Sequence, residues 1–385
     1  MTIKEIQSAF TKMYHSEPQL YYAPGRVNII GEHTDYNHGY VMPMAINMGT
    51  TVAIAKSHDD NITVYSNNLS EIYVFKLGNI VNKNAPSWTN YVYGLTTLLL
   101  ENNTNLSGMN IFINSNLPMG AGLSSSASLS ISLGHAILDI HGLPVNLPEL
   151  TKISQQVEHQ FIGTQCGIMD QTICAMAKIG HAMQLDCMSL KTKYIPFESD
   201  DVSLLICDTG VKHQLCSSEY NIRKQECDII CKYFHIDSLR HLGLNKLNSQ
   251  KDNIPANLYN RAFHVITENQ RVLDTSSAMA LKDWPTFGDL LYKSHDSLRD
   301  KYNVSCSELD FLVENARGIP DIYGARMTGG GFGGCAIFLI RKSQYHTIKS
   351  KLTKDYKIEF NKNLTSYMSK PHSGVQRIMN TSQPL

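Results

Sequence analysis

The pattern of hydrophobic and polar positions predicts helices and strands that alternate along the first hundred residues. Residues 3–14 carry apolar side chains at helical spacing, which is typical of a short amphipathic helix. Runs that are β-branched or alternate in polarity follow at 49–56, 62–66 and 71–76, and such runs indicate strands. A helical pattern then covers residues 88–100.

The stretch Pro118–Ser128, PMGAGLSSSAS, joins a predicted strand at 109–114 to a helical pattern at 129–140. A turn that opens a helix presents unpaired backbone N–H groups and the positive end of the helix dipole, which suits a phosphate. Gly120 and Gly122 let the backbone approach a ligand, because glycine carries no Cβ. A well-capped helix after an ordinary loop is the alternative, and the turn alone leaves both interpretations open.

Three serines in this turn, Ser124, Ser125 and Ser126, offer hydroxyl groups. Such hydroxyls can cap a helix, contact phosphate oxygens or bind a magnesium ion. The chain lacks the pattern G-x-x-x-x-G-K-[ST], so a Walker-type P-loop does not explain the turn.

A segment near the N-terminus combines strand residues with ionisable ones. Arg26, Glu32, His33 and Asp35 stand within ten residues among apolar positions, and turn residues frame them on both sides. Two carboxylates, an imidazole and a guanidinium could together bind several hydroxyl groups of a sugar and a phosphate. A surface loop with self-satisfied salt bridges is the alternative.

Two further carboxylates stand near predicted helices. Apolar residues at Leu150, Ile153 and Val157 place Glu158 at the edge of a buried helix face, where a carboxylate can reach into a cleft. Asp170 ends a glycine-containing turn and precedes another apolar segment. It is either a helix N-cap or a catalytic carboxylate.

From about residue 185 a second unit is predicted. An apolar strand at 202–208 ends in Asp-Thr-Gly, and a helix that carries Tyr220 begins at Ser218. Residues 239–255 are polar and irregular, which predicts a surface insertion. Three helical patterns follow, at 258–281, 286–300 and 306–317.

Residues 323–340 are predicted to form a strand, a glycine turn and a second strand. Five glycines occupy the six positions 329–334, and such a run holds backbone shapes that side chains would forbid, often beside a ligand. It is not a dinucleotide-binding fingerprint, because an apolar strand and not a helix follows. A last helix is predicted at 344–355.

Length and composition bound the class of protein. A chain of 385 residues predicts two lobes at roughly 100–200 residues per domain. Lys plus Arg equals Asp plus Glu, 34 each, and the formal net charge is zero. This balance argues against a nucleic-acid or anionic-membrane partner, because no global basic field exists to steer one.

The nine cysteines show no C-x-x-C spacing, so we interpret them as buried small hydrophobic residues in a reducing compartment. The N-terminus lacks the apolar core of a signal peptide. No run approaches the ~20 apolar residues of a membrane span. We therefore expect a cytoplasmic protein.

Three motifs now stand in order: Pro24–Asn37, Pro118–Ser128 and Arg326–Cys335. Together they resemble the three signatures of the GHMP small-molecule kinases, and the first closely resembles the signature of the galactokinase family. The resemblance covers roughly residues 18–340. Further matches are found at Cys166–Gln171, Ser217–Arg223 and Ser294–Arg299.

The resemblance implies a two-lobed α+β fold with the active site in the cleft between the lobes. Residues 1–185 would form the N-terminal lobe with the sugar and ATP motifs, and residues 186–385 the C-terminal GHMP lobe. It also implies Mg²⁺-assisted transfer of the ATP γ-phosphate to the anomeric C1 hydroxyl of galactose, the first committed step of galactose catabolism. Small-molecule substrates and a monomeric state complete this expectation.

The family's site residues carry over by motif. The implied sugar-binding positions are Glu32, His33, Thr34, Asp35, Asp170 and Tyr220. The implied nucleotide-binding loop is Gly120, Ala121, Gly122, Leu123, Ser124, Ser125 and Ser126. The implied magnesium-linked positions are Ser126 and Glu158. Trp88 and Tyr91 fall where the family tends to line its adenine pocket.

The resemblance also implies the catalytic pair. Asp170 matches the acid beside the C1 hydroxyl, and Arg26 matches the nearby cation. Arg26 can lower the pKa of the attacking hydroxyl or stabilise charge on the transferred group. Asp170 can accept the hydroxyl proton or only orient it, and the sequence leaves both roles open.

Three other functions compete with galactose phosphorylation. An N-acetylgalactosamine kinase is the alternative within the class, but Thr34 and the Gly-Gly-Gly-Phe run at 329–332 resemble galactokinases more closely. A non-catalytic sensor of galactose and ATP is disfavoured because the Ser124–Ser128 loop is whole. A protein whose glycine turns are merely structural is disfavoured by three motifs in family order.

Overall fold

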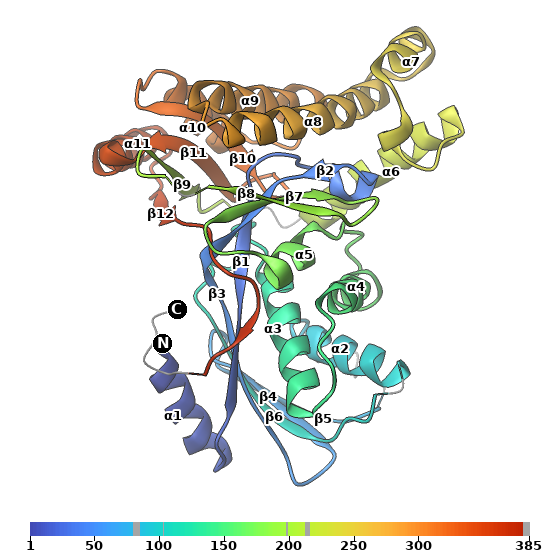
Figure 1. Ribbon diagram of the computed structural model, residues 1–385, viewed down its shortest axis with the longest axis vertical. Coiled ribbons are helices and arrows are strands. Elements are labelled where there is room, and N and C mark those ends of the chain that lie inside the picture. The colour runs from blue at the N-terminus through green and yellow to red at the C-terminus, as the bar shows by residue number, and fades with distance from the viewer. Residues whose placement is uncertain (80–84, 103, 198, 212–215, 380–385) are drawn as a thin grey trace.

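The computed structural model describes residues 1–79, 85–102, 104–197, 199–211 and 216–379, and no side chain is described for 216–218. The side chains of Ser217 and Ser218, the first two residues of the motif at 217–223, therefore lie outside the described residues. Helices and strands alternate along the described chain and form three sheets with helices packed against them (Figure 1). The predicted α+β class is confirmed.

The largest sheet has six strands in the order β13-β1-β3-β6-β4-β5. Its neighbours are antiparallel except β4 and β6, which are parallel. The register of β1 against β3 shifts between Pro24 and Arg26, and an irregularity of this kind re-aims side chains beside a functional site. The strands are β1 (Gln19–Asn28), β3 (Pro43–Lys56), β4 (Asn61–Ser66), β5 (Glu71–Lys76), β6 (Met109–Ser115) and β13 (Gln376–Arg377).

Helices cover this sheet on both faces (Figure 1). Apolar residues of the strands form one core with α2, α3 and α4, and α1 packs against Leu20, Ala53 and Phe112 in a separate cluster. A short π-helical turn at Glu158–Ile162 follows α4. The helices are α1 (Ile3–Tyr14), α2 (Thr89–Glu101), α3 (Ser125–Ile140), α4 (Leu147–Val157) and α5 (Met169–Met176).

The second half of the chain builds an antiparallel sheet in the order β10-β11-β9-β12. Its strands are β9 (Val202–Asp208), β10 (Ile322–Thr328), β11 (Cys335–Arg341) and β12 (Thr365–Ser369). A third sheet joins β2 (Tyr40–Val41), β7 (His181–Asp186) and β8 (Thr192–Pro196). Helices α8 and α9 lie side by side at one end of the molecule, next to α10 (Figure 1). The helices are α6 (Cys216–Phe234), α7 (Leu244–Asn248), α8 (Ala256–Ala280), α9 (Trp284–Ser297), α10 (Ser307–Arg317) and α11 (Tyr345–Phe360).

A shared apolar core joins the large sheet to the four-stranded one. Val27 and Met44 of the large sheet lie in one cluster with Leu123 of the glycine–serine turn, and with Leu204 and Ile337 of the second sheet. Packing in this cluster therefore ties the two sheets and the glycine–serine turn together. The division of the chain at residue 185 stays a proposal.

The predicted helices and strands are confirmed, with one correction at residues 239–255. These residues are not irregular, because they contain two 3₁₀ turns and the helix α7. Leu239, Leu242 and Leu247 are buried there. The first 3₁₀ turn and α7 each bury one leucine, and the 3₁₀ turn at 251–253 buries no residue. The segment therefore carries no periodic pattern that the sequence could reveal.

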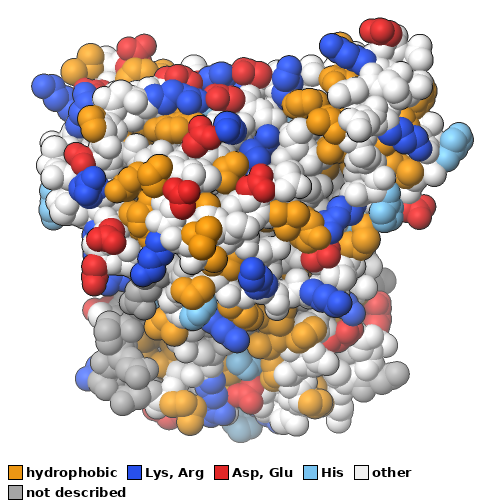
Figure 2. Space-filling view, turned by 45° about the horizontal axis from the view of Figure 1, so that its top comes forward, with side chains coloured by type: hydrophobic (Ala, Val, Ile, Leu, Met, Phe, Trp, Pro, Cys, Tyr) orange, Lys and Arg blue, Asp and Glu red, His pale blue; other side chains and the backbone are white. Residues whose placement is uncertain are grey.

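The surface charges, the helix lengths and the burial of the cysteines relate to the expectations drawn from composition. Basic and acidic side chains are intermixed over the face drawn in Figure 2. No helix in the described ranges is long and apolar enough to cross a membrane. Among the described cysteines, Cys166 and Cys306 are partly exposed and the others are buried.

Candidate active site

A cavity of about 440 Å³ opens where the three motifs meet. Its walls come from β1 and the loop after it, the glycine–serine turn, the segment between α4 and α5, and the turn between β10 and β11. The predicted site residues that line it are Arg26, Glu32, His33, Asp35, Gly120, Gly122, Leu123, Ser124, Ser125, Ser126, Glu158, Asp170 and Tyr220. Thr34, Ala121 and Trp88 are not among its lining residues.

The glycine–serine turn opens α3 toward the cavity. Gly120 and Gly122 both have φ of +74°, a left-handed conformation that glycine adopts without strain. Helix α3 begins at Ser125, and its N-cap residue Ser124 makes no side-chain capping bond. The first-turn N–H groups therefore stay available to a ligand, which supports the phosphate interpretation over a capped helix. Ala121 of this turn is buried and does not line the cavity.

Arg26 and Asp170 form a bidentate ion pair. The Arg26 Nε lies 2.7 Å from Oδ1 of Asp170, and Nη2 lies 2.9 Å from Oδ2. The third nitrogen of the guanidinium donates to the Gly122 carbonyl at 2.6 Å, and the Ser124 hydroxyl donates to Oδ2 of Asp170. These bonds tie strand β1, the glycine–serine turn and α5 together. Because Ile168 occupies the N-cap position of α5, the N-cap interpretation of Asp170 is wrong.

Asp35 is a buried carboxylate that faces the same cavity. Burial raises its pKa to about 7, and the charge of Asp170 adds to the shift, whereas a backbone hydrogen bond at Tyr36 opposes it. Gly167 packs directly on this carboxylate, because a Cβ built at residue 167 would lie 2.2 Å from Oδ2 of Asp35. An acceptor held this way suits the hydroxyl groups of a polyhydroxylated ligand.

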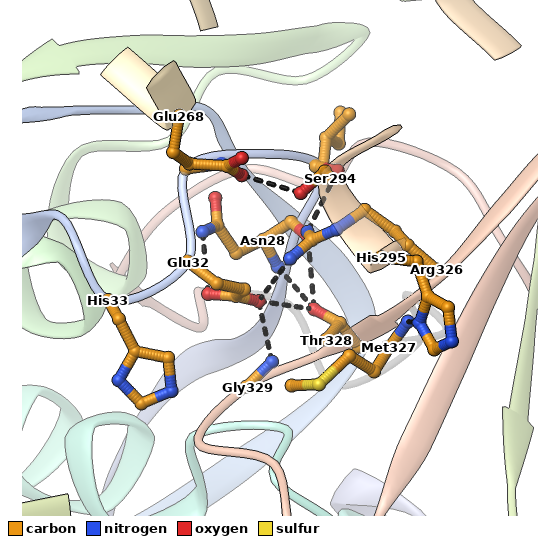
Figure 3. Close-up of polar contacts among 12 residues, drawn as sticks. Asn28, Glu32, His33, Glu268, Ser294, His295, Arg326, Met327, Thr328 and Gly329 are labelled. Atoms are coloured by element: carbon orange, nitrogen blue, oxygen red, sulfur yellow. Dashed lines mark hydrogen bonds and ion pairs between the residues drawn. The ribbon is translucent and has the colours of Figure 1, made fainter. Parts of the chain in front are cut away.

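Glu32 is held by donors from its own segment and from β10 (Figure 3). Asn28 donates to Oε2 at 2.8 Å, while the Gly329 N–H and the Thr328 hydroxyl donate to Oε1 at 2.6 and 3.2 Å. The guanidinium of Arg326 lies 3.6 Å from Oε1. Burial raises the pKa of Glu32, and the charge of Arg326 opposes that rise. The surface-loop alternative for this motif is wrong, because Glu32 is 2% exposed.

Arg326 is fully buried and connects the same two segments. Its Nη1 donates to the carbonyls of Asn28 and Ile29, each at 3.0 Å. A second buried carboxylate lies nearby: Glu268 of α8 accepts from the Gly31 N–H at 2.9 Å and from the Ser294 hydroxyl at 2.6 Å (Figure 3). The loop after β1 is therefore fixed from both α8 and β10.

His33 and Tyr220 form an aromatic side of the cavity. The His33 Nε2 lies 3.2 Å from the Gly330 carbonyl, and its Nδ1 lies 2.8 Å from the Tyr36 hydroxyl. Burial lowers the pKa of His33 to about 3, so the imidazole is neutral. The Tyr220 ring lies 5.4 Å from the His33 ring and 5.0 Å from that of Tyr36.

Two implied ligand contacts need correction. Thr34 is fully buried, and its hydroxyl oxygen lies 2.7 Å from the carbonyl oxygens of both Gly31 and Tyr40, between which its single proton is shared. It therefore fixes the loop from behind the cavity wall. Trp88 donates its indole N–H to Glu71 at 2.6 Å, away from the cavity that Tyr91 lines.

Glu158 fits a role beside a divalent cation. It is 5% exposed, burial raises its pKa, and hydrogen bonding with Ser126 opposes that rise. Within the described residues no three His, Cys, Asp or Glu side chains form a metal-binding group. Magnesium commonly binds one or two protein oxygens together with substrate phosphates, so one carboxylate and one hydroxyl at the phosphate turn are a suitable donor set.

Several residues of the site were not singled out from the sequence. Asn28, Gly167, Arg326 and Thr328 all lie inside the quoted motifs, and that position is the only signal they carry. Their contacts join segments that are far apart in the chain, such as Gly167 with Asp35 and Thr328 with Asn28. No spacing rule reports such a contact.

Comparisons with known proteins agree with this geometry. Residues 90–178 match the model of the GHMP kinases N terminal domain, and residues 276–358 match GHMP kinases C terminal. Residues 8–56 match the galactokinase galactose-binding signature. A crystal structure of mevalonate kinase shares the fold, with a TM-score of 0.64 at 21% identity over 91% of this chain and 98% of that one.

Galactokinases are similar to this chain over nearly its whole length. The galactokinase of Thermotoga petrophila is 42% identical over 92% of this chain and 99% of its own. That of Roseiflexus sp. is 37% identical over 99% of this chain and 98% of its own. The crystal structure of Lactococcus lactis galactokinase complexed with galactose has a TM-score of 0.94 at 33% identity, and the match covers 98% of this chain and 100% of that one.

Fold and site thus define a GHMP kinase, with an uncapped helix terminus and buried carboxylates at one cavity. Within that class, the chain belongs to the galactokinase family.

Proposed function

We propose that this protein transfers the γ-phosphoryl group of ATP to the C1 hydroxyl of D-galactose. The observation that carries the proposal is the Arg26–Asp170 pair at the uncapped N-terminus of α3. It stands between a phosphate-binding turn and a group of buried hydrogen-bond acceptors. Phosphoryl transfer requires chiefly positioning and charge stabilisation, and this arrangement supplies both.

Asp170 acts on the attacking hydroxyl. Its Oδ2 accepts from Arg26 and Ser124, whereas its Oδ1 accepts only from Arg26 Nε among the hydrogen bonds of the described residues. A carboxylate oxygen has two lone pairs, so Oδ1 retains one for the C1 hydroxyl. Asp170 can thereby orient this hydroxyl and take its proton, while Arg26 stabilises the charge that develops nearby.

ATP binds at the glycine–serine turn. The backbone N–H groups from Gly120 to Ser126 would contact its phosphates, and Tyr91 would flank the nucleotide. Ser126 and Glu158 would hold Mg²⁺, which would neutralise charge on the triphosphate. Glu158 is buried and lines the same cavity as Ser126, which supports this assignment.

Galactose binds among Glu32, His33, Asp35 and Tyr220. Buried acceptors that are left unpaired by the wrong sugar give strong discrimination, and Asp35 is such an acceptor. The galactose complex of the Lactococcus lactis relative supports the choice of sugar. Thr34 would contribute indirectly, by holding the loop that carries its neighbours.

A coupled assay of ADP release over a panel of sugars tests the proposal. Galactose with Mg²⁺-ATP should give the fastest turnover. Faster turnover of N-acetylgalactosamine would favour that kinase activity instead. Binding of galactose and ATP without any turnover would favour a sensor. The monomeric state and the cytoplasmic location stay predictions, which sedimentation and fractionation would check.

A further inference from the structure

Behind the cavity wall, a row of hydrogen-bonded side chains runs from His33 to Cys227. The His33 Nδ1 lies 2.8 Å from the Tyr36 hydroxyl. The Tyr36 hydroxyl lies 2.9 Å from that of Tyr302, and the Tyr302 hydroxyl lies 3.2 Å from the Cys227 Sγ. These residues come from the loop after β1, the turn after α9, and α6. The proposed chemistry uses none of them except His33.

The chemical groups determine which atom donates in each hydrogen bond of the row. The Gly330 carbonyl can only accept, so the His33 Nε2 at 3.2 Å must carry the proton of the neutral ring. The Nδ1 of His33 then has a lone pair and accepts from Tyr36. The Tyr36 oxygen in turn accepts from the Tyr302 hydroxyl.

At the Cys227 end of the row, the hydrogen bonds also run from donor to acceptor toward His33. The Cys227 thiol donates to the Tyr302 oxygen, and burial, which raises the pKa of this thiol to about 12, keeps it protonated. The Asn37 amide donates to the Cys227 sulfur at 3.5 Å and to the His33 carbonyl at 3.0 Å. The row therefore closes on the backbone of the residue at which it starts.

We propose that Tyr302 is a positioning residue of the active site, which acts through Tyr36 to fix the tautomer and orientation of His33 against Gly330. His33 and Gly330 both line the cavity, and they belong to the first and third motifs. Their contact joins two walls of the sugar site, so its loss would loosen galactose binding. The kinetic part of this inference rests on the proposed function, whereas the tautomer does not.

Removing the hydroxyls alone leaves the packing intact. The Tyr302 ring lies 4.9 Å from the His33 ring and 4.6 Å from the His264 ring, and phenylalanine would keep both contacts. Tyr292 provides a matched control, because its hydroxyl is buried without a hydrogen-bond partner among the described residues and it does not line the cavity.

Steady-state kinetics of Tyr36→Phe, Tyr302→Phe and the double variant test the proposal. Each single variant should raise the galactose KM about three- to tenfold, as expected for one buried hydrogen bond. The ATP KM and kcat should change less than about twofold, as should every constant of Tyr292→Phe. Because Tyr302 acts through Tyr36, the double variant should match Tyr36→Phe. Additive effects, or an unchanged galactose KM in Tyr302→Phe, would overturn the proposal.

Nitrogen-15 NMR of histidine-labelled protein tests the tautomer independently of turnover. The His33 signals are assigned by their loss in His33→Gln. Protonation at Nε2 in the wild type, with a shifted Nδ1 signal in both phenylalanine variants, is the expected result. Protonation at Nδ1 would overturn the proposal. If galactose were not turned over at all, the proposed function would fail while this spectrum still decided the role of Tyr302.

Discussion

The pairing of Asp170 with Arg26 and Ser124 makes this carboxylate the most informative single residue. Replacing Asp170 by Asn keeps the size of the side chain but removes the acceptor for the hydroxyl proton. We expect kcat to fall about 10²- to 10⁴-fold, the usual contribution of general acid–base catalysis. Calorimetry should find galactose affinity within about threefold of wild type, because other groups bind the sugar. Nearly intact turnover would exclude Asp170 as the base.

Asp35 predicts a pH dependence of galactose binding. Burial raises its pKa to about 7, so the carboxyl is ionised above that pH and protonated below it. The protonated form accepts hydrogen bonds from hydroxyl groups more weakly. The galactose KM should therefore rise as the pH falls through about 7, and Asp35→Asn should flatten this dependence. A galactose KM that is constant from about pH 6 to about pH 8 in the wild type would contradict the assignment.

The same shift affects stability with the opposite sign. A folded-state pKa above the unfolded value of 3.8 means that the folded state binds the proton more tightly. Asp35 therefore favours the folded state at low pH, and this contribution is lost as the pH rises through about 7. Galactose, by donating hydroxyl groups to the carboxylate, would offset that loss.

At the scale of elements, the approach of α5 to the loop after β1 depends on Gly167. A Cβ there would overlap the Asp35 carboxylate, with its nearest atom at 2.2 Å. Gly167→Ala should therefore displace Asp35 and raise the galactose KM about tenfold or more, since a displacement near 1 Å is costly at an active site.

Gly243→Ala is the matched control for Gly167→Ala. No atom lies within 4 Å of a Cβ built at residue 243, so this variant should keep wild-type kinetics. Steady-state measurement of both variants checks the prediction. Equal galactose KM values for the two would show that Asp35 is not constrained by Gly167.

The sequence predicted most of the longer elements because these carry their own periodic patterns, whereas short strands such as β2 and β13 were not predicted. Helices such as α1 and strands such as β4 could be located from spacing alone. The turn at 118–124 was predicted as a phosphate site, and its uncapped helix supports that interpretation. The prediction for 239–255 was wrong because the buried Leu239, Leu242 and Leu247 form no repeating pattern.

The roles of individual residues within the motifs were harder to predict than the presence of the motifs. Thr34 was expected to touch the sugar, but its hydroxyl bonds two backbone carbonyls behind the wall. Arg326 was quoted only as a motif letter, yet it is fully buried beside Glu32. Such assignments depend on which face of a loop looks into the cavity, and neither composition nor spacing encodes this.

At the scale of the whole molecule, the shared core predicts cooperative unfolding. Residues of both sheets, such as Val27 and Ile337, belong to one buried cluster. We therefore expect a single calorimetric transition. Galactose at about 100 times its Kd should stabilise the folded state by about 2.7 kcal/mol and move the whole transition upward. Two transitions, of which galactose shifts only one, would contradict this account.

The most direct test of the central claim is to locate the phosphate on the product. The protein is incubated with galactose and Mg²⁺-ATP, and the mixture is analysed by proton–phosphorus correlation NMR. If the hydroxyl at C1 is the nucleophile beside Asp170, a new phosphorus signal will correlate with the H1 proton of galactose. A correlation with any other sugar proton, or no sugar phosphate at all, would contradict the account.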